Sequence, residues 1–181
     1  SVDDVNARRS AEKATHHPAY RDMLTELPNR TSLHIELERA LQDWRNLETP
    51  FAVMMLDLDG FKPVNDTHGH DTHDEVLKLV GQRILQINRG SDFAARLGGD
   101  EFVILLRNCG SLEQAREVGQ RFIDAIARPM KLEGVELNIT IGSSAGVAHI
   151  SQGATTTEEI LKQADEALYL AKNAGRNRLA V

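Results

Sequence analysis

The chain has 181 residues and a mass of 20.1 kDa, with 21 basic against 27 acidic side chains and a net charge of −6. This length suits one compact domain with a short appendage, and a hydrophobic content of 41% excludes disorder of the whole chain. The acidic balance argues against general nucleic-acid binding. It leaves room for a small phosphate ligand, which needs only a few local cations.

The absence of an apolar run near 18 residues predicts that no segment of this sequence spans a membrane. The single cysteine, Cys109, excludes an internal disulfide and a thiolate-rich metal site, and favours a reducing, cytoplasmic location. This cytoplasmic location of the domain is compatible with membrane anchoring of a longer protein that contains it. A catalytic role for Cys109 is not predicted, because no activating base stands near it in the sequence.

Two regions with different patterns divide the chain. Residues 1–20 are polar with few apolar anchors, which is typical of a linker or stalk that follows an upstream module. A helix is compatible with this segment, although its apolar stripe is too thin to stabilise one alone. Residues 21–181 carry a regular apolar pattern and are expected to form the folded domain. The start at Ser1 and the abrupt end at Val181 suggest a fragment of a longer protein.

The apolar spacing from residue 21 onward predicts a succession of short elements. In chain order these are a helix over 33–44, a buried strand over 51–56, a helix over 76–87, a hairpin of strands 93–97 and 102–106, a helix over 115–126, two strands on either side of Gly134 with the longer within 137–147, and a helix over 161–171. Ser111 and Thr156 open capping boxes, and Gly175 is a typical C-terminal glycine. The strand–helix–strand–strand–helix–strand core predicts a ferredoxin-like α+β fold with an antiparallel sheet and helices on one face.

Asp57 and Asp59 follow the first buried strand, and strand alternation places both on the same face. Carboxylates at the end of a strand are common ligands of Mg²⁺, which prefers hard oxygen donors and substrate phosphates. The simpler alternative is that one of the two acids only caps the turn. The pattern favours metal binding by Asp57.

Asp100 and Glu101 come directly after Gly98 and Gly99 in the predicted hairpin. Two glycines allow positive φ or a close approach of the backbone to a ligand, although they are equally compatible with a tight, solvated polar turn. The second acidic segment decides between these interpretations, because two acidic strand ends in one sheet can converge on divalent metals for phosphoryl transfer.

Two further polar segments lie at helix ends. Asp74 stands near the start of the second helix, where an acid is also a favourable helix-start residue, and the nearby histidines lack the partners of a zinc site. Lys172 and Arg176 lie at the end of the last helix, where they either complement the helix dipole or hold phosphates. The sequence has no Walker phosphate loop.

These segments together resemble the GGDEF domain of diguanylate cyclases. The matching segments stand in the family's order and cover the chain from Asp22 to about Arg178: 22–30, 57–62 with 65–66, 69–70, 96–102, 164–169 and 171–178. The resemblance implies the palm-like nucleotidyl-cyclase form of the ferredoxin-like core, with a central antiparallel sheet, surrounding helices and an extra β-hairpin. It also implies that two GTP-loaded domains face each other as a homodimer, and that two GTP condense into cyclic di-GMP and two pyrophosphates.

The resemblance also implies roles for individual residues. Asp57, Glu101 and the Leu58 carbonyl would ligate Mg²⁺ or Mn²⁺, two ions per active half-site, and Asp100 would be a further ligand or help to activate the 3′-hydroxyl. The implied GTP contacts are guanine reading by Asn65 and Asp74, phosphate binding by the Phe61 and Lys62 amides with Lys172 and Arg176, and close backbone approach at Gly98 and Gly99. Such a site works by positioning and charge neutralisation.

Arg89 and Asp92 match the family's Arg-x-x-Asp site, at which the cyclic di-GMP product inhibits the enzyme. The simpler alternative is an exposed ion pair in a turn, which contributes little to stability. The family spacing favours product binding.

His73 departs from the family, which usually has glycine there, and the larger side chain is expected to weaken GTP affinity.

Three functional hypotheses follow from the sequence. The first is an active diguanylate cyclase with an upstream sensory module. The second is a weak or inactive GTP- or cyclic-di-GMP-binding regulatory domain that precedes a phosphodiesterase domain of the EAL type. The third is adenylate-cyclase-like or polymerase-palm chemistry, which shares the two-metal logic and differs in nucleotide preference.

Overall fold

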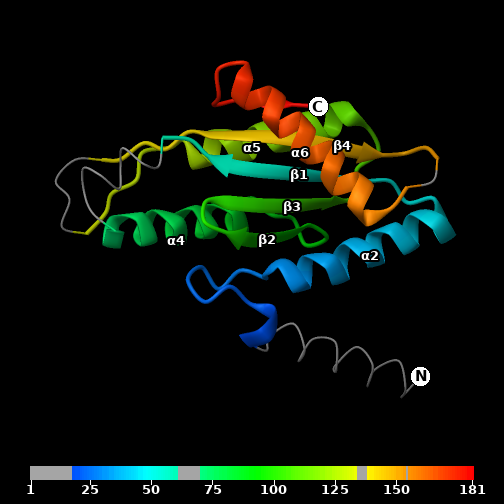
Figure 1. Cartoon of the computed structure of the whole chain (residues 1–181), viewed down its shortest axis with the longest axis horizontal. Coiled ribbons are helices and arrows are strands. Elements are labelled where there is room, and N and C mark those ends of the chain that lie inside the picture. Colours follow the sequence, from blue (N-terminus) through cyan, green and yellow to red (C-terminus); the bar gives the residue numbers. More distant parts are fainter. Residues whose placement is uncertain (1–17, 61–69, 134–137, 154) are drawn as a thin grey trace.

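The computed structural model describes residues 18–60, 70–133, 138–153 and 155–181 (Figure 1). In chain order the elements are η1 (Pro18–Tyr20), α2 (Arg30–Leu47), β1 (Phe51–Leu58), α4 (His70–Ile87), β2 (Phe93–Gly98), β3 (Glu101–Arg107), α5 (Leu112–Ile126), β4 (Ser143–Ile150), α6 (Thr157–Asn173) and β5 (Leu179–Ala180). The predicted stalk lies almost wholly outside these residues and stays a prediction. None of the helices within these ranges combines the length and apolarity that a membrane crossing requires.

One five-stranded sheet in the order β2-β3-β1-β4-β5 forms the centre of the domain. The first four strands pair antiparallel, as the sequence predicts. β5 pairs parallel with β4, which makes the sheet mixed. This last strand was not predicted, because two residues are too few to show an alternating pattern.

Helices cover both faces of the sheet, so the expectation of helices on one face holds only for the core unit. α4 and α5 pack on one face, where even-numbered residues of β1 such as Met54 and Leu56 are buried. α2 and α6 pack on the other face against odd-numbered residues such as Phe51 and Val53. The reason is visible in β1 itself, whose continuous apolar run buries side chains on both sides.

The helix starts predicted at Ser111 and Thr156 are confirmed by side-chain caps, since each accepts a hydrogen bond from the backbone N–H three residues later, at 3.1 and 3.2 Å. Asn29, for which no cap was predicted, caps α2 in the same way at 3.2 Å. Gly175 adopts a φ of 123° just after α6, as expected for a C-terminal glycine. These features are local, so they follow directly from the sequence.

The strand predicted within residues 137–147 is wrong in its bounds. β4 begins only at Ser143 and continues to Ile150. Ile139 instead pairs with Met130 in an isolated antiparallel bridge, with N–H···O distances of 2.7 and 2.8 Å. One apolar stretch is therefore divided between two pairings, which periodicity alone does not separate.

Candidate active site

The C-terminal end of β1 carries Asp57, which is only 8% exposed. Its Oδ2 accepts a hydrogen bond from the ammonium group of Lys172, which α6 supplies from 115 positions later. Its Oδ1 is buried without a hydrogen-bond partner. Because a buried carboxylate oxygen without a donor is costly, Asp57 keeps an acceptor position that suits a cation.

The β2–β3 turn brings the second pair of acids to the same end of the sheet. The register of β1 with β3 sets Asp57 opposite Glu101. The Leu58 N–H donates to the Asp100 carbonyl at 3.2 Å, which ties the turn to the end of β1. The two acidic segments, 44 residues apart in sequence at Asp57 and Glu101, thus lie side by side in the fold (101 − 57 = 44).

The acids at this end repel one another electrostatically. Burial, followed by the negative charge of Asp57, raises the pKa of Asp100 above its ordinary value, and the nearby Lys172 partly offsets the shift. Hard oxygen donors in such a setting fit a divalent cation such as Mg²⁺. A complete metal centre is not preassembled, since no three metal-binding side chains gather among the residues that the structure describes. Lys172 supplies the local positive charge instead.

Arg96 clamps the glycine turn, a role that the sequence analysis did not assign. Its Nε and Nη2 donate to the Gly99 carbonyl at 3.0 and 2.8 Å, and its Nη1 donates to Asp22 at 2.8 Å. Gly98 and Gly99 have φ of 141° and 51°, the left-handed region that favours glycine. The guanidinium therefore holds an unusual turn against a loop that lies 74 positions earlier.

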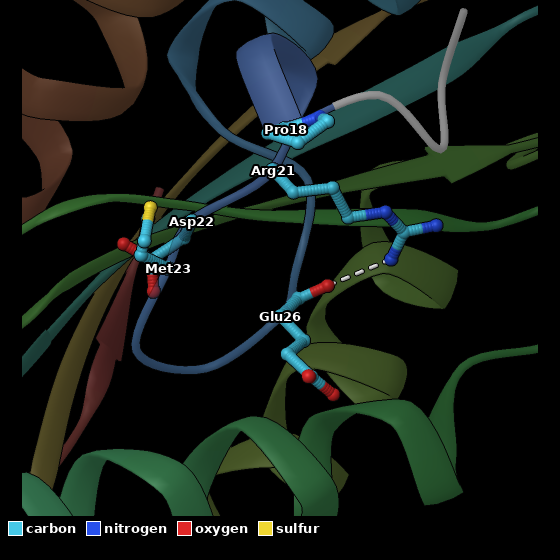
Figure 2. A pocket seen from close by; sticks show the side chains of 5 residues that line it. All are labelled: Pro18, Arg21, Asp22, Met23 and Glu26. Atoms are coloured by element: carbon cyan, nitrogen blue, oxygen red, sulfur yellow. Dashed lines mark hydrogen bonds between the residues drawn. The ribbon is translucent and has the colours of Figure 1, made fainter.

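The loop around Asp22 stabilises the negative charge of the Asp22 carboxylate. The Thr25 N–H and hydroxyl donate to Asp22 Oδ2 at 2.8 and 2.7 Å. Across the loop, Arg21 donates to the Glu26 carbonyl at 2.7 Å (Figure 2). The residues labelled in Figure 2 line a hollow of about 530 Å³. Burial raises the pKa of Asp22, but the Thr25 hydrogen bonds and the Arg96 charge outweigh it and bring the pKa below its ordinary value.

The lowered pKa gives a testable pH dependence for Asp22→Asn. Because the folded-state pKa lies below the ordinary 3.8, the carboxylate stabilises the fold above that value, and this contribution is lost as the pH falls through the folded-state pKa. We expect the substitution to lower the free energy of unfolding by about 1–3 kcal/mol at pH 7, with a smaller difference below pH 3.8. Urea unfolding across this range measures both. A loss of the same size for exposed Asp124→Asn would contradict it.

The two cationic residues at the end of α6 have different surroundings. Lys172 lies in the last helical turn, where a positive charge complements the helix dipole, and it also forms an ion pair with Asp57. Arg176 lies beyond the helix, is exposed, and has a φ of 64°. The loop that carries Arg176 lies beside the end of β1, because the N–H of the next residue, Asn177, donates to Asp59.

Three of the residues that the resemblance implies for GTP binding, Phe61, Lys62 and Asn65, lie outside the described residues. Asp74 is exposed in α4, and His73, the departure from the family pattern, is half-buried beside it. The proposed guanine contacts therefore remain predictions.

Arg89 and Asp92 form the turn between α4 and β2. The Arg89 N–H donates to Asp92 Oδ2 at 3.2 Å, and its Nε lies 3.7 Å from the same atom. The two side chains differ sharply, since that of Arg89 is 53% exposed and that of Asp92 only 1%. Asp92 Oδ1 is buried without a hydrogen-bond partner, and the residue borders a hollow of about 650 Å³. A simple exposed ion pair does not account for this buried acceptor.

Comparison with known proteins identifies the class of protein to which this fold belongs. The model of the family described as "Diguanylate cyclase, GGDEF domain" matches residues 19–178, so the chain belongs to this family. It is 35% identical over 175 residues to diguanylate cyclase DosC of Escherichia coli, covering 95% of this chain and 37% of that protein. It is 40% identical over 159 residues to the bifunctional diguanylate cyclase/cyclic di-GMP phosphodiesterase MucR of Pseudomonas aeruginosa, covering 88% and 23%.

A solved structure gives the same result for the fold. The GGDEF domain of DgcB from Caulobacter crescentus, crystallised in complex with c-di-GMP, superposes with a TM-score of 0.84 at 31% identity and covers 91% of this chain and 93% of that one. The predicted fold class is confirmed. The chain spans well under half the length of the two curated relatives described above.

Proposed function

We propose that this domain is a diguanylate cyclase that condenses two GTP molecules into cyclic di-GMP and two pyrophosphates. The observation that carries the proposal is the pairing of Asp57 opposite Glu101, with Asp100 and Lys172 beside them. This arrangement concentrates acids and a cation at one end of the sheet, in a chain that belongs to the GGDEF family. Phosphoryl transfer needs mainly positioning and charge neutralisation, which such groups supply.

In the proposed reaction, the 3′-oxygen of each GTP attacks the α-phosphorus of the other GTP across an antiparallel homodimer. Each attack forms one phosphodiester bond, breaks one α–β anhydride bond and releases pyrophosphate, while the 3′-hydroxyl proton passes to a base or to water. Asp100 would assist this proton transfer or serve as a further metal ligand. Two ions per half-site, Mg²⁺ or Mn²⁺, would neutralise the phosphates when bound to Asp57, Glu101 and the Leu58 carbonyl.

The protein's own residues would bind and orient GTP. Gly98 and Gly99 would let the backbone approach the nucleotide, because neither has a side chain and both already have positive φ. Lys172 would exchange its contact with Asp57 for a contact with the β- and γ-phosphates of GTP. Arg176, on the loop after α6, would bind the same phosphates. The Phe61 and Lys62 amides would complete the phosphate contacts.

Guanine recognition is assigned to Asn65 and Asp74. A carboxylate suits the N1–H and N2–H₂ donors of guanine, and an amide suits its acceptor edge. We infer that His73, which is half-buried beside Asp74, narrows this region and weakens GTP affinity without preventing turnover.

The test is to incubate the purified domain with GTP and Mg²⁺ at high protein concentration and to identify the products by mass spectrometry. Cyclic di-GMP with pyrophosphate is the expected result. Activity should rise faster than linearly with protein concentration, because two domains must meet. GTP binding without any cyclic product would instead favour the regulatory-domain hypothesis, and a cyclic adenine product would favour an adenylate-cyclase-like enzyme.

A regulatory site for the product is also proposed at Arg89 and Asp92. The partnerless, buried Oδ1 of Asp92 suits a donor edge such as that of guanine, and exposed Arg89 can stack on the base or contact phosphate.

In the full-length protein, an upstream sensory module and a downstream phosphodiesterase domain are the partners that we propose for this domain, in a cytoplasmic setting.

Arg89→Ala tests product inhibition. We expect the cyclic di-GMP concentration that halves activity to rise by about tenfold or more, since truncating a central charged contact commonly costs over 1.4 kcal/mol. Initial rates measured at increasing added product provide the readout. Exposed Arg116→Ala on α5 is the control, and an unchanged inhibition curve for Arg89→Ala would contradict the assignment.

A further inference from the structure

Asp59 has no part in the mechanism above, yet it is one of the most heavily hydrogen-bonded acids at this end of the fold. It lies one residue beyond β1, and its backbone N–H donates to the Gly142 carbonyl at 2.8 Å. The Ser144 hydroxyl lies 2.9 and 3.0 Å from its two carboxylate oxygens. The Asn177 N–H donates to Oδ2 at 2.8 Å. Both oxygens of Asp59 are therefore engaged within the protein.

This makes Asp59 different from Asp57, although both lie at the same end of β1. Asp57 has a buried oxygen without a donor, whereas each oxygen of Asp59 already accepts from the protein. A metal ion at Asp59 would have to share these oxygens with the protein's own hydrogen bonds, whereas Oδ1 of Asp57 has no such competitor. The sequence places both acids on one face and favours Asp57 for metal binding, but only the structure shows which groups contact Asp59.

The loop that Asp59 holds has an unusual backbone. Gly175, Arg176 and Asn177 have φ of 123°, 64° and 47°, so two non-glycine residues adopt left-handed conformations in succession. Such residues persist only where the surrounding structure fixes them, since each costs about 1 kcal/mol or more. Backbone hydrogen bonds fix the two ends of the loop. The Arg176 N–H donates to the Ala171 carbonyl at 3.1 Å, and the Arg178 carbonyl accepts from the Ala145 N–H of β4 at 2.9 Å.

Asp59 and Ser144 act on the middle of the loop. The Asn177 N–H lies 2.8 Å from Asp59 Oδ2 and 3.2 Å from Ser144 Oγ, so this donor is satisfied by side chains alone. The Asp59 carboxylate thus compensates the strained residue that follows Arg176. Without it, the chain would be free to relax toward ordinary φ values, and the Arg176 guanidinium would lose its position.

We propose that Asp59 is a positioning residue that holds the loop carrying Arg176 in the geometry for binding the phosphates of GTP, and that it is not a metal ligand. This inference rests on the proposed function, because it assumes that Arg176 contacts the nucleotide. Asp59 acts through the Asn177 N–H, and Ser144 orients the carboxylate.

The kinetic test compares Asp59→Ala with the conservative Asp59→Asn. Asparagine keeps an oxygen that can accept from Asn177, so we expect it to retain a KM for GTP within about threefold, whereas alanine raises KM about tenfold with a smaller change in kcat. Asp124→Ala on the exposed face of α5 is the control for loss of one negative charge. Equal damage by both Asp59 variants, with a higher Mg²⁺ requirement, would overturn the proposal in favour of metal ligation.

A double-mutant cycle asks whether Asp59 acts through the loop. If it does, Asp59→Ala added to Arg176→Ala should raise KM no further than Arg176→Ala alone. Independent, multiplicative effects of the two substitutions would overturn the proposed coupling. Ser144→Ala, which leaves the carboxylate in place, should give an intermediate KM.

A structural measurement separates this inference from the cyclase proposal. Amide hydrogen exchange of the peptide over residues 172–181 needs no turnover and should speed up at least about tenfold in Asp59→Ala but much less in Asp59→Asn. Unchanged exchange in Asp59→Ala would refute the positioning role even if the wild type is an active cyclase. Faster exchange in a protein that makes no cyclic di-GMP would support the loop contact while refuting the proposed function and, with it, the link to GTP.

Discussion

Replacing Glu101 by glutamine is expected to lower cyclic di-GMP synthesis by about a hundred- to a thousandfold. Glu101 is exposed at the first position of β3, directly opposite Asp57 on β1, and none of the hydrogen bonds found between described side chains depends on it. Glutamine keeps its shape and removes its charge. The loss should therefore fall on metal binding and on charge neutralisation at the phosphates, with the fold unchanged.

The control and the alternative outcomes make this test decisive. Glu117→Gln changes an equivalent exposed acid on α5, far from the acidic strand ends, and should leave turnover as it is. Thermal unfolding of Glu101→Gln should match that of the wild type. Retained cyclic di-GMP synthesis would contradict the role of Glu101. If the domain instead works by binding nucleotide as a regulator, its regulatory output should survive the substitution largely intact.

The sequence predicts those parts of this molecule that depend on neighbours along the chain. The caps at Ser111 and Thr156 use side chains three residues from their partners, so a short window contains the whole interaction. The acidic strand end at Asp57 and the glycine turn at Gly99 follow in the same way, from a buried run and from a need for positive φ.

The interactions that the sequence did not predict all join distant segments. Asp22 meets Arg96 across 74 positions, and Asp59 meets Asn177 across 118. No period or spacing encodes such a pairing, because it arises only when the sheet brings loops together at one end. The two acids of the first strand end illustrate the limit: alternation places Asp57 and Asp59 on one face, but only the fold shows which of them has an oxygen to spare.

Gly146→Ala is the substitution with the largest expected effect on stability. Gly146 lies inside β4, where α6 crosses the sheet (Figure 1). A Cβ built on it would lie 2.1 Å from the Leu168 nitrogen, 2.2 Å from the Ala164 oxygen and 2.7 Å from the Ala167 carbonyl carbon. All three atoms belong to the backbone of α6 and cannot yield as the tip of a side chain does. The whole helix would have to move away from the sheet.

We expect Gly146→Ala to lower the free energy of unfolding by more than about 3 kcal/mol, a large part of the 5–15 kcal/mol typical of a domain. Urea unfolding measures the loss, with Gly110→Ala as the control, since a Cβ there meets only the Gln114 side chain at 3.8 Å. Equal stability of the two variants would contradict the close packing. Because α6 also carries Lys172, any Gly146→Ala protein that does fold should bind GTP more weakly, which links the contact of helix and sheet to the position of the cation beside Asp57.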